Sequence, residues 1–178
     1  GDGSTFGIKI IYLTQKVANG TGAALQIALN YLNEDLLVMA GDTLFTHKNI
    51  SISISEFNKN NCDGFLALKE LTEKEILKTS YVELTNDNLI SNFIEKPKLS
   101  QINGNISSAL LHIYKPIFAS YLKKITISSR GEKELTEATI DMIKDGKIIK
   151  GSIIERPLDL TDPKDILKYN FQYLNNIL

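Results

Sequence analysis

The sequence of 178 residues has one cysteine, Cys62, four prolines, no tryptophan and no long apolar run. A single cysteine has no partner for an internal disulfide, so we expect Cys62 to be a small, partly buried side chain. The apolar runs are far too short to cross a bilayer, so no membrane partner is expected. Because no secretory signal stands at the start, the sequence favours a cytoplasmic location.

An excess of charge of either sign is also missing, since 20 Lys and Arg balance 21 Asp and Glu. A nearly neutral chain has no bulk electrostatic attraction to nucleic acid, so DNA and RNA are not expected partners. His47 and His112 lie far apart with no Cys or His at ligand spacing, which argues against a zinc site. The length and the 43% apolar fraction suit one domain, predicted to span residues 1–178.

Apolar segments alternate between strand-like and helix-like patterns along the chain. Strand-like segments at 8–13 and 36–40 flank a helical pattern at 21–32, and together they predict a strand–helix–strand unit. Segment 36–40 is apolar throughout, as expected for a strand covered on both faces. This unit predicts an α/β fold with a parallel sheet.

The remaining segments continue the α/β pattern. Residues 50–57 fit both a strand and a helix, and the helix is favoured because a turn-like stretch follows. Thr136 and Asp162 are predicted N-caps of the last two helices. The other predictions are strands at 64–71, 107–114 and 147–155, a hairpin at 81–96, and helices at 116–125, 135–146 and 162–178.

Two carboxylates stand where predicted strands end. Asp42 follows segment 36–40 after Gly41, and Asp159 lies near a strand-to-helix junction. Ligands of open α/β sheets bind beyond the carboxyl ends of strands, and Mg²⁺ prefers oxygen ligands that it shares with substrate phosphates. The pattern therefore indicates a candidate Mg²⁺ site. A structural role remains open for each residue, as a turn cap for Asp42 and as part of the junction for Asp159.

Two further stretches have the residue types of a ligand site. Gly20 and Gly22 lie at the mouth of a helix, where backbone N–H groups favour a negative or hydrogen-bonding ligand, although the spacing alone favours a turn-shaping role. Gln15, just before them, has an amide that can read the edge of a base. Glu95 and Lys96 end a strand, and neighbours on a strand point to opposite faces. A bulge or the following proline, Pro97, would let both side chains serve one pocket. The alternative to a pocket is an exposed ion pair that leads into a loop.

Taken in order, six stretches resemble the sugar-1-phosphate nucleotidylyltransferases, such as glucose-1-phosphate thymidylyltransferase and uridylyltransferase. They are GDGSTFGIKIIYLTQ, NGTGAAL, VMAGDTLF, FIEKP, GEKELTEATIDMI and LDLTDPKDIL, from Gly1 to Leu167. The resemblance implies a Rossmann-like α/β fold with a mostly parallel sheet flanked by helices. It also implies a Mg²⁺-dependent transferase of nucleotide-sugar biosynthesis, which joins a nucleoside triphosphate to a sugar 1-phosphate and releases pyrophosphate.

The resemblance also assigns roles to single residues of this sequence. The implied roles are nucleotide binding for Gln15, Gly20 and Thr21, sugar binding for Ser80, Glu95, Lys96 and Leu110, metal binding for Asp42 and Asp159, and catalysis for Asp42 and Lys96.

Four features depart from the family pattern. The opening strand and the glycine-rich loop, with the arginine that engages the triphosphate, do not appear, so we expect the N-terminal part of the fold to be absent and the fragment to be inactive alone. Thr79-Ser80 replaces Tyr-Gly, and Leu110 replaces a glycine in a segment usually reading Asn-Ala-Gly. Thr161 replaces a glycine, and no Trp or Tyr precedes Asp159. A leucine at 110 would push into the space where the backbone approaches the sugar.

Two function hypotheses follow from the resemblance. The charged residues at the metal and sugar positions favour an enzyme whose partners are a nucleoside triphosphate and a sugar 1-phosphate. Leu110, Ser80 and the missing loop favour the alternative, a catalytically impaired homologue that binds nucleotide or nucleotide-sugar and regulates a partner. A glycosyltransferase would more often have an Asp-x-Asp pair, which the sequence lacks. Because family members often assemble, a homo-oligomer is one candidate state.

Overall fold

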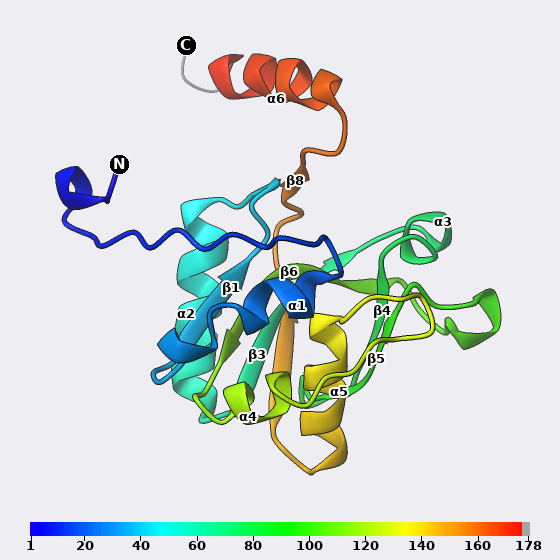
Figure 1. Cartoon of the computed structure of the whole chain (residues 1–178). Coiled ribbons are helices and arrows are strands. Elements are labelled where there is room, and N and C mark those ends of the chain that lie inside the picture. Colours follow the sequence, from blue (N-terminus) through cyan, green and yellow to red (C-terminus); the bar gives the residue numbers. More distant parts are fainter. Residues whose placement is uncertain (176–178) are drawn as a thin grey trace.

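A four-stranded mixed sheet organises the computed structural model, which describes the backbone of residues 1–175 and the side chains of residues 1–170 (Figure 1). Its strand order is β1 (Leu36–Met39), β6 (Ile106–Tyr114), β3 (Gly64–Glu70) and β7 (Ile149–Ile153). β3 and β7 are parallel, whereas β6 runs antiparallel to both of its neighbours. The α/β class is confirmed. The sheet is less parallel than predicted, because the reversed strand β6 lies between β1 and β3.

Two short two-stranded sheets, six α-helices and three 3-10 turns complete the described part of the fold. β2 (Thr43–Leu44) pairs with β8 (Leu158–Asp159), and β4 (Ser80–Leu84) pairs with β5 (Ile90–Glu95), both antiparallel. The helices of the described residues are α1 (Thr21–Gln26), α2 (His47–Asn60), α3 (Glu73–Ile76), α4 (Phe118–Leu122), α5 (Leu135–Lys144) and α6 (Pro163–Asn175). None of them is long and apolar enough to span a membrane.

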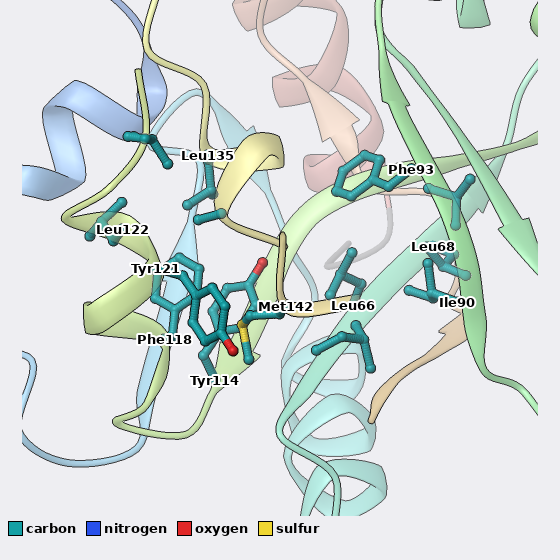
Figure 2. Close-up of a cluster of buried hydrophobic side chains, with 14 residues drawn as sticks. Leu66, Leu68, Ile90, Phe93, Tyr114, Phe118, Tyr121, Leu122, Leu135 and Met142 are labelled. Carbon is teal, nitrogen blue, oxygen red and sulfur yellow. The ribbon is translucent and has the colours of Figure 1, made fainter. Parts of the chain in front are cut away.

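Strand β3 forms the centre of the core because it is buried on both faces. Leu66 and Leu68 pack in one cluster with side chains of α4 and α5, including Met142 (Figure 2). Phe65 alternates to the other face and packs with Phe57 of α2. The two sides of the sheet are therefore covered by different helices, and β3 is held between them.

Several predictions from the sequence are confirmed. The ambiguous segment 50–57 is helical: Thr46 caps α2 by accepting the Asn49 N–H at 3.1 Å, and Asn61 ends it with a φ of 44°. Asp162 caps α6 by accepting the Lys164 N–H at 2.8 Å. The strands at 64–71, 107–114 and 147–155 and the hairpin at 81–96 are present, and Cys62 is buried.

Other predictions are wrong. Segment 8–13 forms no strand but lies extended on the surface, with Ile8 58% exposed, because β-forming side chains make a strand only where a neighbour pairs with it. The strand–helix–strand unit therefore does not form. β1 lies at an edge of the sheet, and its exposed Leu37 and Met39 contradict the prediction of cover on both faces. The 21–32 helix ends at Gln26, with a 3-10 turn at Leu29–Tyr31.

The N-cap predicted at Thr136 is also wrong. Helix α5 begins at Leu135 after the extended residue Glu134, so Thr136 lies inside the first turn. Its hydroxyl does not cap the helix but donates to Oε2 of Glu95 at 3.0 Å. The Thr136 hydroxyl, which the local sequence pattern assigned to a helix cap, therefore makes a tertiary contact with the β4–β5 hairpin instead.

Candidate active site

The two predicted metal carboxylates lie at the paired strands β2 and β8, with Asp42 in the turn just before β2 and Asp159 on β8. Thr43 stands opposite Asp159, and the Leu160 N–H donates to the backbone oxygen of Asp42 at 2.8 Å. The Thr43 hydroxyl donates to Oδ1 of Asp159 at 3.2 Å, whereas Asp42 is exposed at the turn before β2. Residues 116 positions apart in the chain are thereby neighbours, which places both carboxylates at one corner of the fold.

Lys69 at the end of β3 is a member of this cluster that the sequence analysis missed. Its side chain is only 7% exposed, and Nζ lies 2.8 Å from Oδ2 of Asp159. Burying an ammonium group is costly unless it is paired, so this ion pair holds both side chains in place. The available signal was a lysine inside an otherwise apolar strand, a position where the charge needs a partner.

The cluster fits an open magnesium site and not a closed one. Among the described residues, no three or more His, Cys, Asp or Glu side chains gather in a group that could enclose a metal ion. Mg²⁺ is commonly held by one or two carboxylates plus substrate phosphates and waters, and Asp42 and Asp159 supply that number. Asp159 already bonds Thr43 and Lys69, but a carboxylate has about four acceptor positions.

The predicted sugar residues Ser80, Glu95 and Lys96 meet at the end of the β4–β5 hairpin. Ser80 stands opposite Glu95 in the strand register, and the Lys96 N–H donates to the Thr79 carbonyl at 2.7 Å. Lys96 has a φ of 44°, so the chain turns out of the strand at this residue. This turn breaks the strand alternation, as required for both residues to serve one pocket. Among the described side chains, Glu95 and Lys96 form no ion pair with each other.

Glu95 is half-buried. Burial raises the pKa of its carboxyl group and the nearby Glu134 adds to that, while the Thr136 hydroxyl, Arg130 and Lys96 oppose the shift. Arg130 donates to the Glu95 carbonyl at 3.0 Å and also pairs with Glu134. The sequence analysis missed Arg130, which directly precedes one of the stretches on which the resemblance rests.

Leu110 connects the metal and sugar sides of the site. It has a φ of 54°, a left-handed conformation that is strained for a leucine. Its carbonyl accepts the Ala40 N–H at 3.1 Å, two residues before Asp42, and its N–H donates to Ser108 Oγ at 3.0 Å. The Ser108 N–H in turn donates to Oγ of the buried Ser80 at 3.3 Å. The position where the family has a glycine therefore has a backbone conformation that suits glycine.

The predicted nucleotide residues lie in the loop before helix α1 and at its first residue, Thr21. The Gln15 amide donates to Oδ1 of Asn19 at 3.0 Å and to the Gly20 carbonyl at 3.2 Å, which leaves its own carbonyl oxygen as an acceptor. Gly20 has a φ of 112°, and a Cβ there would collide with the Lys133 backbone. Close packing thus explains the glycine at 20, in agreement with the turn-shaping alternative. A cleft of about 430 Å³ lies along Gln15.

The segment before α5 joins the nucleotide loop to the sugar side. The Gly22 N–H donates to the Lys133 carbonyl at 3.0 Å, and the Leu135 N–H donates to Oγ1 of Thr21 at 3.2 Å. One residue later, Thr136 bonds Glu95. A second cleft, of about 860 Å³, is lined by Lys69 and Asp159 together with Thr79 and part of α6. The nucleotide loop and the sugar side are therefore linked by hydrogen bonds through the start of α5, while the clefts along Gln15 and Asp159 have different linings.

Known proteins resemble this chain along almost its whole length. The profile of one family, described as Nucleotidyl transferase, matches residues 1–176. The bifunctional protein GlmU of Methanococcus maripaludis is 32% identical over 170 residues, which are 96% of this chain and 39% of that protein. A bifunctional sugar-1-phosphate nucleotidylyltransferase/acetyltransferase of Sulfurisphaera tokodaii is 32% identical over 174 residues, 96% of this chain and 40% of that protein.

A solved structure shares the fold. The crystal structure of UDP-glucose pyrophosphorylase complexed with UDP-glucose matches with a TM-score of 0.79 and 19% identity, over 93% of this chain and 66% of that chain. At this identity the likeness shows the fold alone, and it confirms the Rossmann-like α/β type. The chain spans about two-fifths of the length of the curated relatives named above.

Proposed function

Because this chain belongs to the nucleotidyl transferase family, we propose that it transfers a nucleotidyl group from a nucleoside triphosphate to a sugar 1-phosphate. The products are a nucleoside diphosphate sugar and pyrophosphate. The observation that carries the proposal is the link through Leu110 between two parts of the site: the carboxylates Asp42 and Asp159 beside the β2–β8 ribbon, and the Glu95–Lys96 turn. The name of the Sulfurisphaera tokodaii relative supports it.

The proposed reaction forms and breaks one bond each at the α-phosphorus. An oxygen of the sugar phosphate attacks in line, and the bond to the oxygen that bridges to the β-phosphate breaks, so pyrophosphate leaves with that electron pair. Little covalent work is left to the protein beyond positioning and charge stabilisation. In this scheme the exposed ammonium of Lys96 binds the sugar phosphate, Glu95 accepts hydrogen bonds from sugar hydroxyls, and Arg130 adds positive charge beside them.

The nucleotide side of the scheme uses the other half of the site. Asp42 and Asp159 would hold Mg²⁺, which supplies positive charge next to the triphosphate when bound. Lys69 fixes the direction of the Asp159 carboxylate through their ion pair. The free carbonyl oxygen of the Gln15 amide accepts a hydrogen bond from the base, with Gly20 and Thr21 beside it.

Pyrophosphate release by the full-length protein tests this function. The assay contains Mg²⁺ and crosses ATP, GTP, CTP, UTP and dTTP with the 1-phosphates of glucose, N-acetylglucosamine, galactose and mannose. Release that requires one particular pair would support the proposal and identify both substrates. Absence of release with every pair, in a protein that still binds nucleotide, would contradict it.

The Lys69–Asp159 ion pair and the strained Leu110 favour a second candidate, a homologue that binds nucleotide or nucleotide-sugar without turnover. In that case the Lys69 ammonium occupies the position at Asp159 that Mg²⁺ would take. The Leu110 side chain then fills the space that the sugar would occupy. Tight UDP-glucose binding by calorimetry, unchanged by Mg²⁺ and without pyrophosphate release, would support this candidate. A Mg²⁺-dependent affinity would contradict it.

A further inference from the structure

Four buried polar side chains cross the core beneath Leu110, and the reaction scheme above does not use them. Ser108 Oγ lies 2.6 Å from Nε2 of His112, and the Tyr114 hydroxyl lies 3.0 Å from Nδ1 of the same ring. That hydroxyl also lies 2.6 Å from Oγ1 of Thr139 on α5. We call these four residues the polar row. Tyr114 belongs to the core cluster and lies beside Phe118 (Figure 2).

The polar row is fully hydrogen-bonded and closed to solvent. His112 is 1% exposed, and burial lowers its pKa to about 3, so the imidazole is neutral at pH 7. A neutral imidazole has one donor and one acceptor nitrogen, and both have a partner in either tautomer. A serine beside a histidine can be a nucleophile with its base, but here no substrate reaches the pair. The row therefore acts on the protein backbone.

Its first effect is on the bulge in β6. Between the pairs Leu66–His112 and Leu68–Ser108, β3 has one residue and β6 has three. In a regular strand, residues four apart are separated by about 13 Å, so the 2.6 Å contact of Ser108 with His112 exists only because β6 bulges. Ser108 Oγ also accepts the Leu110 N–H. One hydroxyl thus closes the bulge from inside and holds Leu110 in its left-handed conformation.

Its second effect is on Glu95, because both ends of the row lead there. At one end, the Ser108 N–H bonds Ser80, which stands opposite Glu95. At the other end, Thr139 lies one turn along α5 from Thr136, whose hydroxyl bonds the Glu95 carboxylate. Strand β6 and helix α5 are thereby fixed to each other on either side of Glu95.

We propose that the polar row sets the geometry of the sugar pocket, with Ser108 and His112 as positioning residues for the Leu110 backbone and for Glu95. The inference rests on the proposed function and identifies residues of the same site that select the acceptor. Loosening the row weakens binding of the sugar 1-phosphate. Binding of the nucleoside triphosphate weakens less, because Gln15 and Gly20 lie on another loop and the row reaches the Asp42 side only through the Leu110–Ala40 hydrogen bond.

Steady-state kinetics of Tyr114→Phe and Thr139→Val test the proposal with glucose 1-phosphate and UTP. Tyr114→Phe removes the hydroxyl but keeps the ring, whose centroid lies 3.9 Å from that of Phe118. We expect the KM for glucose 1-phosphate to rise about threefold to tenfold, the usual effect of one lost hydrogen bond, and the KM for UTP to rise by less. Ser53→Ala, which removes a buried hydroxyl from α2, is the control and changes neither. An equal rise in both constants, or no rise, would overturn the proposal.

Hydrogen exchange at the Leu110 amide gives a readout that needs no turnover. In Ser108→Ala we expect this amide to exchange at least about fivefold faster, while the amides of α2 keep their rates. If that variant does not fold, Tyr114→Phe is measured in its place with a smaller acceleration expected. An unchanged Leu110 rate would overturn the role of the row. A protein that releases no pyrophosphate yet shows the acceleration would contradict the proposed function and leave the row's effect on the bulge standing.

Discussion

Leu110 is unusual in two respects: it replaces a glycine of the family pattern, and its backbone has a left-handed conformation that is strained for a leucine. A left-handed leucine costs roughly 1 kcal/mol that a glycine does not, but removing the side chain also loses packing. Comparing Leu110→Gly with Leu110→Ala isolates the backbone, because both remove the side chain. We predict that Leu110→Gly is about 1 kcal/mol more stable than Leu110→Ala in urea unfolding. The opposite order, normal for residues with negative φ, would contradict the assigned conformation.

The same pair of variants addresses the sugar pocket. If the leucine side chain fills space near the acceptor, both substitutions widen the range of sugar 1-phosphates accepted in the pyrophosphate assay. An unchanged sugar profile would show that the side chain points away from the acceptor.

Asp42 allows function to be separated from stability. It is exposed, and its carboxylate makes no hydrogen bond within the described part of the chain. We therefore predict that Asp42→Asn keeps the wild-type free energy of unfolding but lowers Mg²⁺-dependent UTP affinity by about tenfold, since a charged ligand is lost. Calorimetry with and without Mg²⁺ measures this. Unchanged affinity would remove Asp42 from the metal site.

Glu95 gives a pH dependence whose sign follows from its raised pKa. A carboxyl group with a folded pKa above its unfolded value stabilises the protein most at low pH, and that contribution is lost as the pH rises above about 4.5 and through the folded pKa. We predict that the stability of wild type relative to Glu95→Gln falls between pH 4 and pH 7. Urea unfolding at both values measures it, and a relative gain at pH 7 would contradict the burial effect.

At the scale of elements, the junction of β3 with the β2–β8 ribbon depends on one buried ammonium. Removing Asp159 leaves Lys69 buried and unpaired, whereas removing the lysine charge leaves Asp159 able to face water, since its side chain is 36% exposed. We predict that Asp159→Ala destabilises by about 1–3 kcal/mol and that Lys69→Met costs less than 1 kcal/mol. Denaturant unfolding measures both losses of stability. Equal losses for the two variants would contradict the prediction, because they would mean that the Lys69 ammonium is hydrated.

The elements also show how far the sequence could predict the fold. Strand Gly64–Glu70 and helix α2 were predictable, because a short apolar run and helical spacing followed by a turn-like stretch are local patterns. Segment 8–13 was not, because the same β-branched residues form a strand only if an edge pairs with them. Thr136 has the local pattern of an N-cap, but its hydroxyl bonds Glu95 of another element. A local pattern does not predict such a tertiary contact.

At the scale of the whole molecule, the site is assembled from segments far apart in the chain (Figure 1). The carboxylates Asp42 and Asp159 and the Glu95–Lys96 turn could be proposed from short motifs and from the family resemblance. The pairing of Lys69 with Asp159 could not, because the two residues lie 90 positions apart in the chain. The polar row could not be predicted either, because the contact of Ser108 with His112 requires a bulge in β6 for which the sequence has no clear signal.

The most direct test of the central claim is the fate of the α-phosphorus. The full-length protein is incubated with Mg²⁺, glucose 1-phosphate and UTP labelled at that atom, or with the substrate pair that the pyrophosphate assay selects. The proposed reaction predicts the label in the nucleoside diphosphate sugar, unlabelled pyrophosphate in equal amount, and loss of both products in Asp42→Asn. Label that stays in the triphosphate or appears only in a nucleoside monophosphate would contradict transfer to a sugar.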